Sequence, residues 1–509
     1  MRFDSSESRN EAARERPDAG ASFDARVAAV AAGGYTELSA ELSDESNAEP
    51  VAAALNRAAG LLGWADEERG PLARVVPRGS RVVVKPNLVL HENQGPWGME
   101  PLVTHPSLIR AAVEAALRAG AAEVLVGDAP IQGCDFGRLL EVTGLGVWAE
   151  ALAKAEPRFK GIRDFRRTTC TFVDGVRVAV EDLQPEDNFV LFDLGGESLL
   201  EPVTDGRGSF RVTCYDQRLL ARTHAPGRHQ YLVAREILEA DVVINLPKLK
   251  THKKAGVTCA LKNLIGINGN KEYLPHHRVG GSALGGDCYE GLSPVKRAVE
   301  FALDRQNTTK SLGAGRVWRG MGAQLERVAN LLGDVTGTEG SWSGNDTIWR
   351  TCLDLNRVLL YGRADASMAD EVQRRVLHLV DAVVAGQGNG PLAPEPLELG
   401  LLLAGASAPA LDWVGALLLG YDPERIPVTR EAFGRFRWPL VTYTPDEVML
   451  AGDVGEGSAA QALGTRASAP VVNHPTGWRD ASARGANDEG ASCDVENSSR
   501  RYARENIVE

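Results

Sequence analysis

The stretch SRVVVKPNLVLHENQGPWGMEPLVTHPSLIRAAVEAALRAGAAEVLVGDAP, residues 80–130, indicates the architecture of the whole chain. It opens with a β-branched run that ends in a proline-marked turn, a pattern typical of a buried strand. A helix pattern follows, with Thr104 as its N-cap, Pro106 in its first turn and Gly120 at its end. The run AEVLVGD then predicts a second strand. Strand, helix and strand in this order predict a parallel sheet with helices on both faces.

The same alternation extends outward in both directions. We therefore expect an α/β fold of two lobes, with largely parallel sheets, helices on both faces and a β-rich insertion at about residues 148–226. The charged and Ser-rich ends, residues 1–21 and 466–509, are predicted to be disordered, which leaves an α/β domain over residues 22–465. The further predicted elements are a strand at 25–32, a helix at 49–64, a helix and a strand within 229–249, a helix at 345–362, a strand and glycine-rich loop at 377–391, and a strand, turn and helix at 397–423.

The composition limits the classes of function. The chain has 509 residues and a net charge of -12, and this acidity argues against nucleic-acid binding and against a patch for anionic membranes. None of the seven cysteines forms a C-x-x-C pair, so the sequence has no zinc-ribbon or 4Fe–4S cluster motif. The odd number of cysteines and the lack of a signal-peptide or membrane-spanning pattern favour a reduced, cytoplasmic setting.

Uncommon polar residues follow the predicted strands at the point where each strand ends. Ligands of open α/β sheets bind just beyond the carboxyl ends of the strands, so we expect these side chains to converge on one pocket. Lysines in such a place, together with asparagines and glycine-rich turns, suit an anion such as phosphate or carboxylate. The predicted substrate-binding residues are Lys85, Asn87, Asn245, Lys248, Lys250, Lys262, Asn263 and Asn389.

Asp128 and His252 are the predicted proton-transfer residues of this pocket, because both follow strands and histidine titrates near neutral pH. A metal site would need His, Cys, Asp or Glu from several loops, and the pair His276 and His277 is too weak a signal to assign one. A surface or substrate-contact role is favoured for these two histidines. The sequence therefore assigns no metal ligand, and it leaves a divalent metal open as a cofactor.

Several neighbouring residues have ordinary structural interpretations. Lys253 and Lys254 are predicted to lie in a solvated loop, and Cys259 is predicted to be a small buried side chain. Asp381 begins its predicted strand, so we expect it at the opposite edge of the sheet. Asp412 falls where a helix is predicted to begin, and helix capping explains it.

Several long segments together resemble the DUF362 family. They are VVVKPNLV, THPSLIRAAVEAALRAGAAEVLVGDAP, ADVVINLPKLKTHKKAGVTCALKNLIGINGNK, GNDTIWRTCLDLNRVLLY and the stretch from DAVVAGQGNGP to LLLGYDP, in family order between about Ala25 and Tyr443. Many relatives join this domain to a ferredoxin-like module with two 4Fe–4S clusters. This chain lacks that cysteine series, so the resemblance implies no cluster here. The domain is also distantly similar to the substrate-binding half of nickel-pincer lactate racemases, a likeness of fold that transfers no activity.

Two functions remain open on these observations. The first is an enzyme that acts on a small anionic metabolite, bearing phosphate or carboxylate, held by the strand-end lysines. The second is a non-catalytic accessory protein that works with a redox iron–sulfur partner, and it predicts a flat apolar surface in place of a closed cleft. A cleft at the strand ends with converging polar side chains would favour the enzyme.

Overall fold

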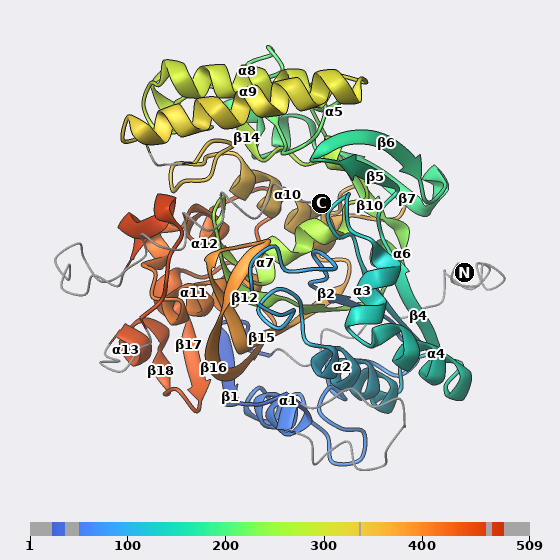
Figure 1. Ribbon diagram of the computed structural model, residues 1–509. Coiled ribbons are helices and arrows are strands. Elements are labelled where there is room, and N and C mark those ends of the chain that lie inside the picture. Colours follow the sequence, from blue (N-terminus) through green and yellow to red (C-terminus); the bar gives the residue numbers. More distant parts are fainter. Residues whose placement is uncertain (1–22, 36–49, 335–336, 465–470, 483–509) are drawn as a thin grey trace.

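The computed structural model describes residues 23–35, 50–334, 337–464 and 471–482, and its centre is a mainly parallel β-sheet (Figure 1). The predicted N-terminal tail and most of the predicted C-terminal tail lie outside the described residues. The sheet has the strand order β18-β17-β1-β16-β15-β11-β2-β3-β4, and β12 and β13 extend it beside β15. Its strands are β1 (Val27–Ala32), β2 (Arg81–Pro86), β3 (Glu123–Asp128), β4 (Phe159–Asp164), β11 (Val242–Leu246), β12 (Lys248–His252), β13 (Gly256–Thr258), β15 (Arg375–Asn389), β16 (Ala393–Gly405), β17 (Met449–Gly452) and β18 (Gly457–Ser458).

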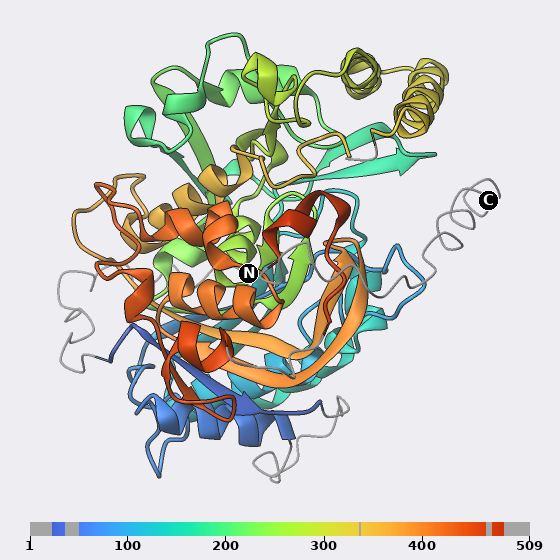
Figure 2. The ribbon, with the colours of Figure 1, turned by 90° about the vertical axis from the view of Figure 1, so that its left-hand side faces the viewer.

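The core of the sheet is parallel, which confirms the α/β fold class predicted from the sequence. β2 pairs in parallel with β3 and β11, β11 with β15, and β3 with β4. The long, curved β15–β16 hairpin, orange in Figure 2, is antiparallel, and so is the pairing of β16 with β1. Parallel strands carry their carboxyl ends to one edge, and this brings the ends of β2, β3 and β11 together.

Alternate side chains of the strands pack on opposite faces of the sheet. Val82 and Val84 of β2 belong to the apolar core shared with α1, α2 and α4, whereas Val83 belongs to the core shared with α10. No helix among the described residues combines the length and the apolar character needed to cross a membrane. The helices are α1 (Pro50–Leu61), α2 (Pro106–Ala119), α3 (Phe136–Val142), α4 (Leu145–Ala155), α5 (Gln217–Thr223), α6 (Arg235–Glu239), α7 (Ala260–Asn263), α8 (Pro294–Thr308), α9 (Leu312–Leu331), α10 (Ile348–Tyr361), α11 (Ala408–Leu418), α12 (Pro427–Arg430) and α13 (Ala459–Gly464).

Small antiparallel sheets lie outside the central one, near the paired helices α8 and α9 at the top of Figure 1. Most of their strands fall within the insertion predicted at about 148–226. However, β4 falls in the same range and is the edge strand of the central sheet, so that range is not a separate β-rich unit throughout. The additional strands are β5 (Thr168–Val173), β6 (Val176–Asp182), β7 (Phe189–Asp193), β8 (Phe210–Arg211), β9 (His224–Ala225), β10 (Arg228–Ala234) and β14 (His277–Arg278).

The start of α2 differs from the prediction and joins two strand ends. His105, and not Thr104, is the N-cap, because its Nδ1 accepts a hydrogen bond from the N–H of Ser107 at 3.2 Å. The hydroxyl of Thr104 instead donates to the carbonyl of Leu246 at 2.6 Å and accepts from the N–H of Asn87 at 2.8 Å. Thr104 therefore ties the end of β2 to the end of β11, where the predicted site residues lie.

The basic stretch after β11 begins as a buried strand and not as a loop. Lys248, Lys250 and His252 all lie in β12, which pairs in parallel with β15 and antiparallel with β13, and all three are buried. The glycine-rich loop predicted within 377–391 is likewise the end of β15, where it turns into β16. Strand pairing therefore fixes the backbone of the lysine-bearing segment.

Residues 471–482, predicted as part of a disordered tail, pack against the body of the protein. They include a 3-10 helix at Thr476–Ala481, in which Trp478 is 1% exposed. The indole N–H of Trp478 donates to the carbonyl of Lys253 at 2.7 Å, and a Cβ at Gly256 would lie 2.7 Å from the indole ring. This segment therefore covers the turn between β12 and β13.

Candidate functional site

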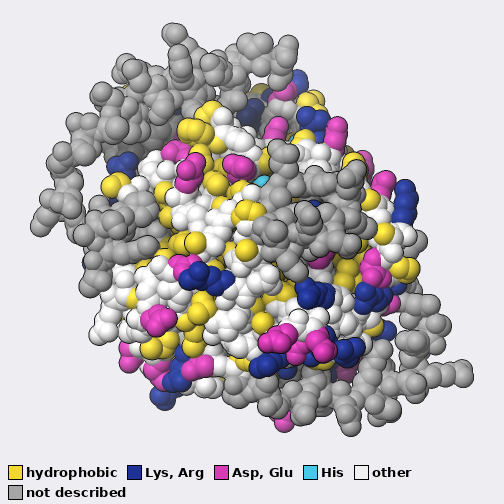
Figure 3. Space-filling view, turned by 90° about the horizontal axis from the view of Figure 1, so that it is seen from below, with side chains coloured by type: hydrophobic (Ala, Val, Ile, Leu, Met, Phe, Trp, Pro, Cys, Tyr) yellow, Lys and Arg dark blue, Asp and Glu magenta, His cyan; other side chains and the backbone are white. Residues whose placement is uncertain are grey.

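A cavity of about 500 Å³ lies at the carboxyl ends of β2, β3 and β12. Among the described residues, seven lysine and arginine side chains line it, against three carboxylates. On the lower face of the molecule, in contrast, charges of both signs are interspersed (Figure 3). The cavity thus concentrates positive charge in a chain whose net charge is -12. The predicted site residues that line it are Lys85, Asn87, Asp128, Lys250, His252, Lys262 and Asn263.

Lys85 and Asp128 form a buried ion pair in the cavity wall. The Nζ atom of Lys85 lies 2.6 Å from Oδ1 of Asp128 and also donates to the carbonyl of Pro86 at 2.9 Å and to Oδ1 of Asn263 at 3.1 Å. Oδ2 of Asp128 accepts from the N–H of Leu88 at 2.7 Å. Burial lowers the pKa of Lys85 and raises the pKa of Asp128. The two pKa values therefore move toward each other, which suits a pair that holds or releases a proton.

Gly266 leaves the space that this ion pair occupies. A Cβ at this position would lie 2.1 Å from Oδ1 of Asp128 and 2.6 Å from Nζ of Lys85. The carbonyl of Gly266 also accepts from the N–H of Ala129 at 2.9 Å, which holds the end of β3 against the 264–267 segment. A side chain at position 266 is therefore incompatible with the ion pair as it stands.

A chain of amide side chains runs from the cavity through the sheet to His378. Lys250 Nζ donates to Asn87 Oδ1 at 3.0 Å, and Asn87 Nδ2 donates to Asn263 Oδ1 at 2.9 Å. Asn263 Nδ2 donates to Asn245 Oδ1 at 2.8 Å, and Asn245 Nδ2 donates to His378 Nδ1 at 3.0 Å. Burial lowers the pKa of His378 to about 3, so its ring is neutral and accepts the last bond. Every step of this amide chain donates in the same direction.

Three predicted site residues do not line the cavity. Lys248 is buried beneath it and pairs with Asp381, with 2.7 Å between Nζ and Oδ2, so the prediction that Asp381 lies at the opposite edge is wrong. Asn245 belongs to the amide chain behind the cavity wall. Asn389 is exposed near the tip of the β15–β16 hairpin, opposite Ala393. A larger cavity of about 710 Å³ beside His378 contains none of the predicted site residues.

Two lysines to which sequence reasoning gave no role meet at Thr213. Lys254 Nζ donates to the hydroxyl of Thr213 at 2.6 Å, and Lys271 Nζ donates to its carbonyl at 3.2 Å. Within the described part of the chain, neither ammonium group forms an ion pair with a carboxylate. Lys254 was predicted in a solvated loop, but it is 6% exposed, and burial lowers its pKa. Two ammonium groups thus converge on one threonine at the cavity wall, and the carboxylate of Glu339 lies close enough to raise the pKa of Lys254 against the effect of burial. We call Lys254, Lys271 and Thr213 the cradle.

Lys262 lies on the short helix α7, partly buried in the cavity wall, and has no hydrogen-bond or ion-pair partner among the described residues. Asp412 holds α7 from below, because its Oδ1 accepts from the N–H of Leu261 at 3.0 Å. Asp412 thus bonds to a backbone N–H of α7 and does not cap its own helix α11, whose N-cap is Ser407. Burial raises the pKa of Asp412 to about 7. Cys259 is buried, as predicted.

His252 and His276 line the cavity with opposite hydrogen-bonding character. Nδ1 of His252 accepts from the N–H groups of Lys254 at 3.0 Å and Ala255 at 3.1 Å, so the neutral ring carries its proton on Nε2. Nδ1 of His276 lies 2.7 Å from the carbonyl of Leu274, which only accepts, so its Nε2 keeps a lone pair. Burial lowers the pKa of both rings well below 6.5, which contradicts the expectation that His252 titrates near neutral pH.

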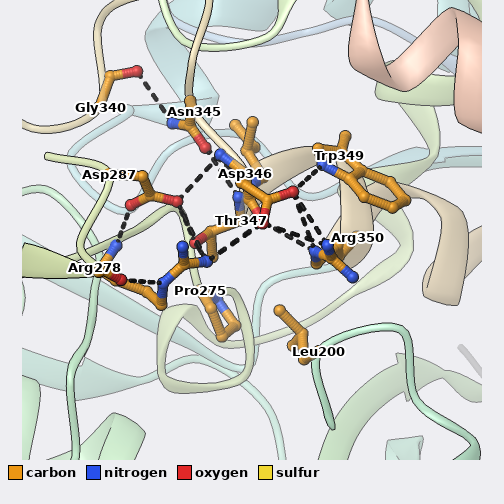
Figure 4. Close-up of polar contacts among 12 residues, drawn as sticks. Leu200, Pro275, Arg278, Asp287, Gly340, Asn345, Asp346, Thr347, Trp349 and Arg350 are labelled. Atoms are coloured by element: carbon orange, nitrogen blue, oxygen red, sulfur yellow. Dashed lines mark hydrogen bonds and ion pairs between the residues drawn. The ribbon is translucent and has the colours of Figure 1, made fainter. Parts of the chain in front are cut away.

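Polar contacts at the start of α10 hold the segment that carries His276 (Figure 4). Nδ2 of Asn345 donates to the carbonyl of His276 at 2.9 Å, and the hydroxyl of Thr351 donates to the carbonyl of Pro275 at 2.7 Å. Asn345 is 69 residues from His276 in the sequence, and no local pattern reports such a contact. This support explains how a histidine with a weak sequence signal has a fixed backbone at the cavity.

The lining of the cavity is rich in side chains that donate hydrogen bonds. Among the described residues, no group of three or more His, Cys, Asp or Glu side chains is placed to hold a metal ion. The lining instead supplies ammonium groups, amides and two imidazoles that come from separate segments. Such groups bind phosphate or carboxylate by charge and by hydrogen-bond donation.

Comparison with known proteins places most of the described chain in one sequence family. A family model described as a domain of unknown function, DUF362, matches residues 82–180 and 204–417. A thylakoid-associated protein of Synechocystis sp. is 26% identical over 195 residues, which are 38% of this chain and 37% of that protein. The chain thus spans little more than a third of the length of this curated relative. A crystal structure of a Thermotoga maritima protein aligns at 11% identity with a TM-score of 0.29, over 71% of this chain and 55% of that chain.

Proposed function

This chain belongs to the DUF362 family, and from that premise we propose that it is an enzyme whose strand-end cavity binds a small phosphate- or carboxylate-bearing metabolite. The observation that carries the proposal is the convergence of Lys254 and Lys271 on Thr213, in a cavity where lysines and arginines outnumber carboxylates. Two ammonium groups that share a threonine repel each other. An anion between them removes this repulsion, and it is the ligand that such a cradle favours.

The cavity that contains the cradle is also lined by His252 and His276. His276 offers a lone pair on Nε2, and His252 offers an N–H on Nε2. The buried pair of Lys85 and Asp128 adds a place where a proton can be held. A proton acceptor and a proton donor in one cavity are the requirements of general acid–base catalysis on a bound substrate.

Sulfate binding tests the anion cradle, because the charge of sulfate does not change near neutral pH. We expect isothermal titration calorimetry to detect sulfate binding by the native protein. Replacing Lys254 and Lys271 together with methionine should weaken it by about tenfold or more, which corresponds to at least roughly 1.4 kcal/mol. The reason is that both ammonium groups of the cradle are lost.

The matched control removes the same charge elsewhere. Lys154 and Lys310 are exposed and do not line the cavity. The double variant Lys154→Met with Lys310→Met should bind sulfate as the native protein does. Equal weakening in both double variants would show that only net charge matters, and a native protein that binds neither sulfate nor phosphate would refute the proposal.

The accessory function is the second candidate, and an exposed apolar stripe on α9 favours it. Val317, Met321, Val328 and Leu331 are exposed and recur at helical spacing along α9, at the top of Figure 1. If this stripe binds an iron–sulfur partner, Val328→Lys with Leu331→Lys should abolish binding of a purified 4Fe–4S ferredoxin in biolayer interferometry and leave sulfate binding unchanged. Failure of the native protein to bind the ferredoxin would remove this candidate.

A further inference from the structure

The lysines around the cavity differ in the number of hydrogen-bond acceptors at their Nζ atoms. Lys85 and Lys248 each have three acceptors, one of which is a carboxylate, and three is the number of donors on an ammonium group. Lys262 has no acceptor among the described residues, although its side chain is partly buried. A charged group in this position loses water and gains no partner, so the neutral amine is favoured.

Burial lowers the pKa of Lys262, and this effect outweighs the opposing influence of Asp128. Lys85 and Lys250 lie close enough to Lys262 to interact with it electrostatically. A desolvated lysine is a nucleophile at a pH where an ordinary lysine is protonated.

The backbone that carries Lys262 is fixed on both sides. Asp412 accepts from the N–H of Leu261, and Asn263 is a link in the amide chain. Neither neighbour of Lys262 can therefore move without breaking a buried hydrogen bond. The backbone of Lys262 thus stands at a defined point of the cavity wall.

We propose that the amine of Lys262 forms a Schiff base with the carbonyl group of the substrate, a small aldehyde or ketone that also carries a carboxylate or phosphate. The anionic group lies in the cradle of Lys254 and Lys271, while the carbonyl carbon faces Lys262. The inference rests on the anion-binding function proposed above and names its substrate class.

The proposed step balances without an oxidant or reductant. The lone pair of Lys262 Nζ attacks the carbonyl carbon, so a C–N bond forms as the C=O π bond breaks. A proton passes from nitrogen to oxygen and gives a carbinolamine, whose C–O bond then breaks to release water and leave the imine. Nε2 of His276 can accept the proton that leaves nitrogen and pass it to the departing hydroxyl, which leaves as water. The N–H on Nε2 of neutral His252 can donate a hydrogen bond to that oxygen and keeps its proton.

Reductive trapping tests this step directly. Glyoxylate is a suitable probe because it joins an aldehyde to a carboxylate. We expect incubation of the native full-length protein with glyoxylate and cyanoborohydride to leave a carboxymethyl group on Lys262, located by peptide mass spectrometry. Labelling of Lys262 should exceed that of exposed Lys154 by about tenfold, because Lys154 is a solvated lysine outside the cavity. Sulfate should inhibit the labelling of Lys262 and not that of Lys154.

The controls separate this inference from the function on which it rests. Lys262→Met should lose the label, whereas Lys154→Met should keep the label on position 262. Sulfate binding by the native protein is the separate test of the anion site. If the protein binds sulfate but labels Lys262 no faster than its surface lysines, the Schiff-base step is wrong and the anion site stands. If acetaldehyde labels Lys262 as well as glyoxylate does and sulfate does not compete, the amine is reactive and the anion cradle is wrong. The labelling pattern of the native protein decides the matter even if a variant fails to fold.

Discussion

The ammonium nitrogen of Lys248 lies 2.7 Å from Oδ2 of Asp381, and neither side chain is exposed. Tyr35 closes the contact, because its hydroxyl donates to Oδ1 of Asp381 and accepts from Lys248, each at 2.7 Å. Lys248→Met should therefore lower the free energy of unfolding by roughly 3–5 kcal/mol, since it leaves a buried carboxylate unpaired. Urea denaturation measures the loss, and Lys248→Met with Asp381→Leu should recover much of it. The folded Lys248→Met variant should bind sulfate with the affinity of the native protein. A loss of affinity without a loss of folding would show that Lys248 contributes to sulfate binding.

Gly266→Ala should disrupt the ion pair of Lys85 and Asp128, because the new Cβ would occupy the space of both charged atoms. We expect a loss of roughly 1–3 kcal/mol of stability from overpacking, together with weaker sulfate binding. Gly60→Ala is the control, since nothing lies within 4 Å of a Cβ built at that exposed helical position. This control should be neutral or slightly stabilising in thermal denaturation. Equal behaviour of the two variants would show that the pair tolerates a side chain at position 266.

Asp412 should make the fold less stable as the pH rises toward neutrality. Its pKa is raised from 3.8 to about 7 by burial, so the folded state binds a proton that the unfolded state releases. The contribution of Asp412 to the free energy of unfolding should be largest below about pH 4. It should fall by up to roughly 4 kcal/mol as the pH rises from about 4 through 7. Asp412→Asn should flatten this dependence in urea titrations between about pH 5 and pH 8. An unchanged slope would mean that Asp412 is ionised in the folded protein.

Removing residues 471–509 should destabilise the lysine-bearing turn, because Trp478 covers it. The loss of this buried indole and of its hydrogen bond to the carbonyl of Lys253 should cost about 3–5 kcal/mol and weaken sulfate binding. A chain that ends at residue 482 is the matched control, and it should melt and bind as the full chain does. Equal melting temperatures for the two truncated chains would show that the segment contributes nothing to the turn.

The sequence predicted the sheet and the edge at which the cavity lies, because both depend on short-range patterns. Alternating strand and helix signals placed Lys85, Asp128 and Lys250 at strand ends, and these residues do line one cavity. Lys248 does not line the cavity, because the chain continues after Pro247 as β12, which sets Lys248 opposite Asp381 in the middle of β15. The local pattern does not show that β15 begins at Arg375, six residues before Asp381. Asp381 was therefore expected at the edge of the sheet opposite the cavity.

The remaining site residues depend on contacts between distant segments. The sequence predicts Lys254 in a solvated loop, but residues 471–482 cover its turn. It favours a surface or substrate-contact role for His276, but Asn345 holds the backbone of that residue at the cavity. The hydrogen-bond partners that set the protons on His252 and His276 are likewise a matter of tertiary structure. Such contacts leave no periodic signal in one sequence.

The one-way amide chain has an electrostatic consequence for the cavity. Because the oxygen ends of its side chains face Lys85 and Lys250, their dipoles act together and take over the role of water around these buried cations. A carboxylate beside Lys250 would have neutralised its charge, whereas the amide oxygen of Asn87 accepts a hydrogen bond from its Nζ and carries no charge. Burial lowers the pKa of Lys250 well below 10.5, and the amide dipoles oppose this lowering. The protonation state of Lys250 is thus set by neutral dipoles, and a negative charge brought into the cavity would favour its protonated form.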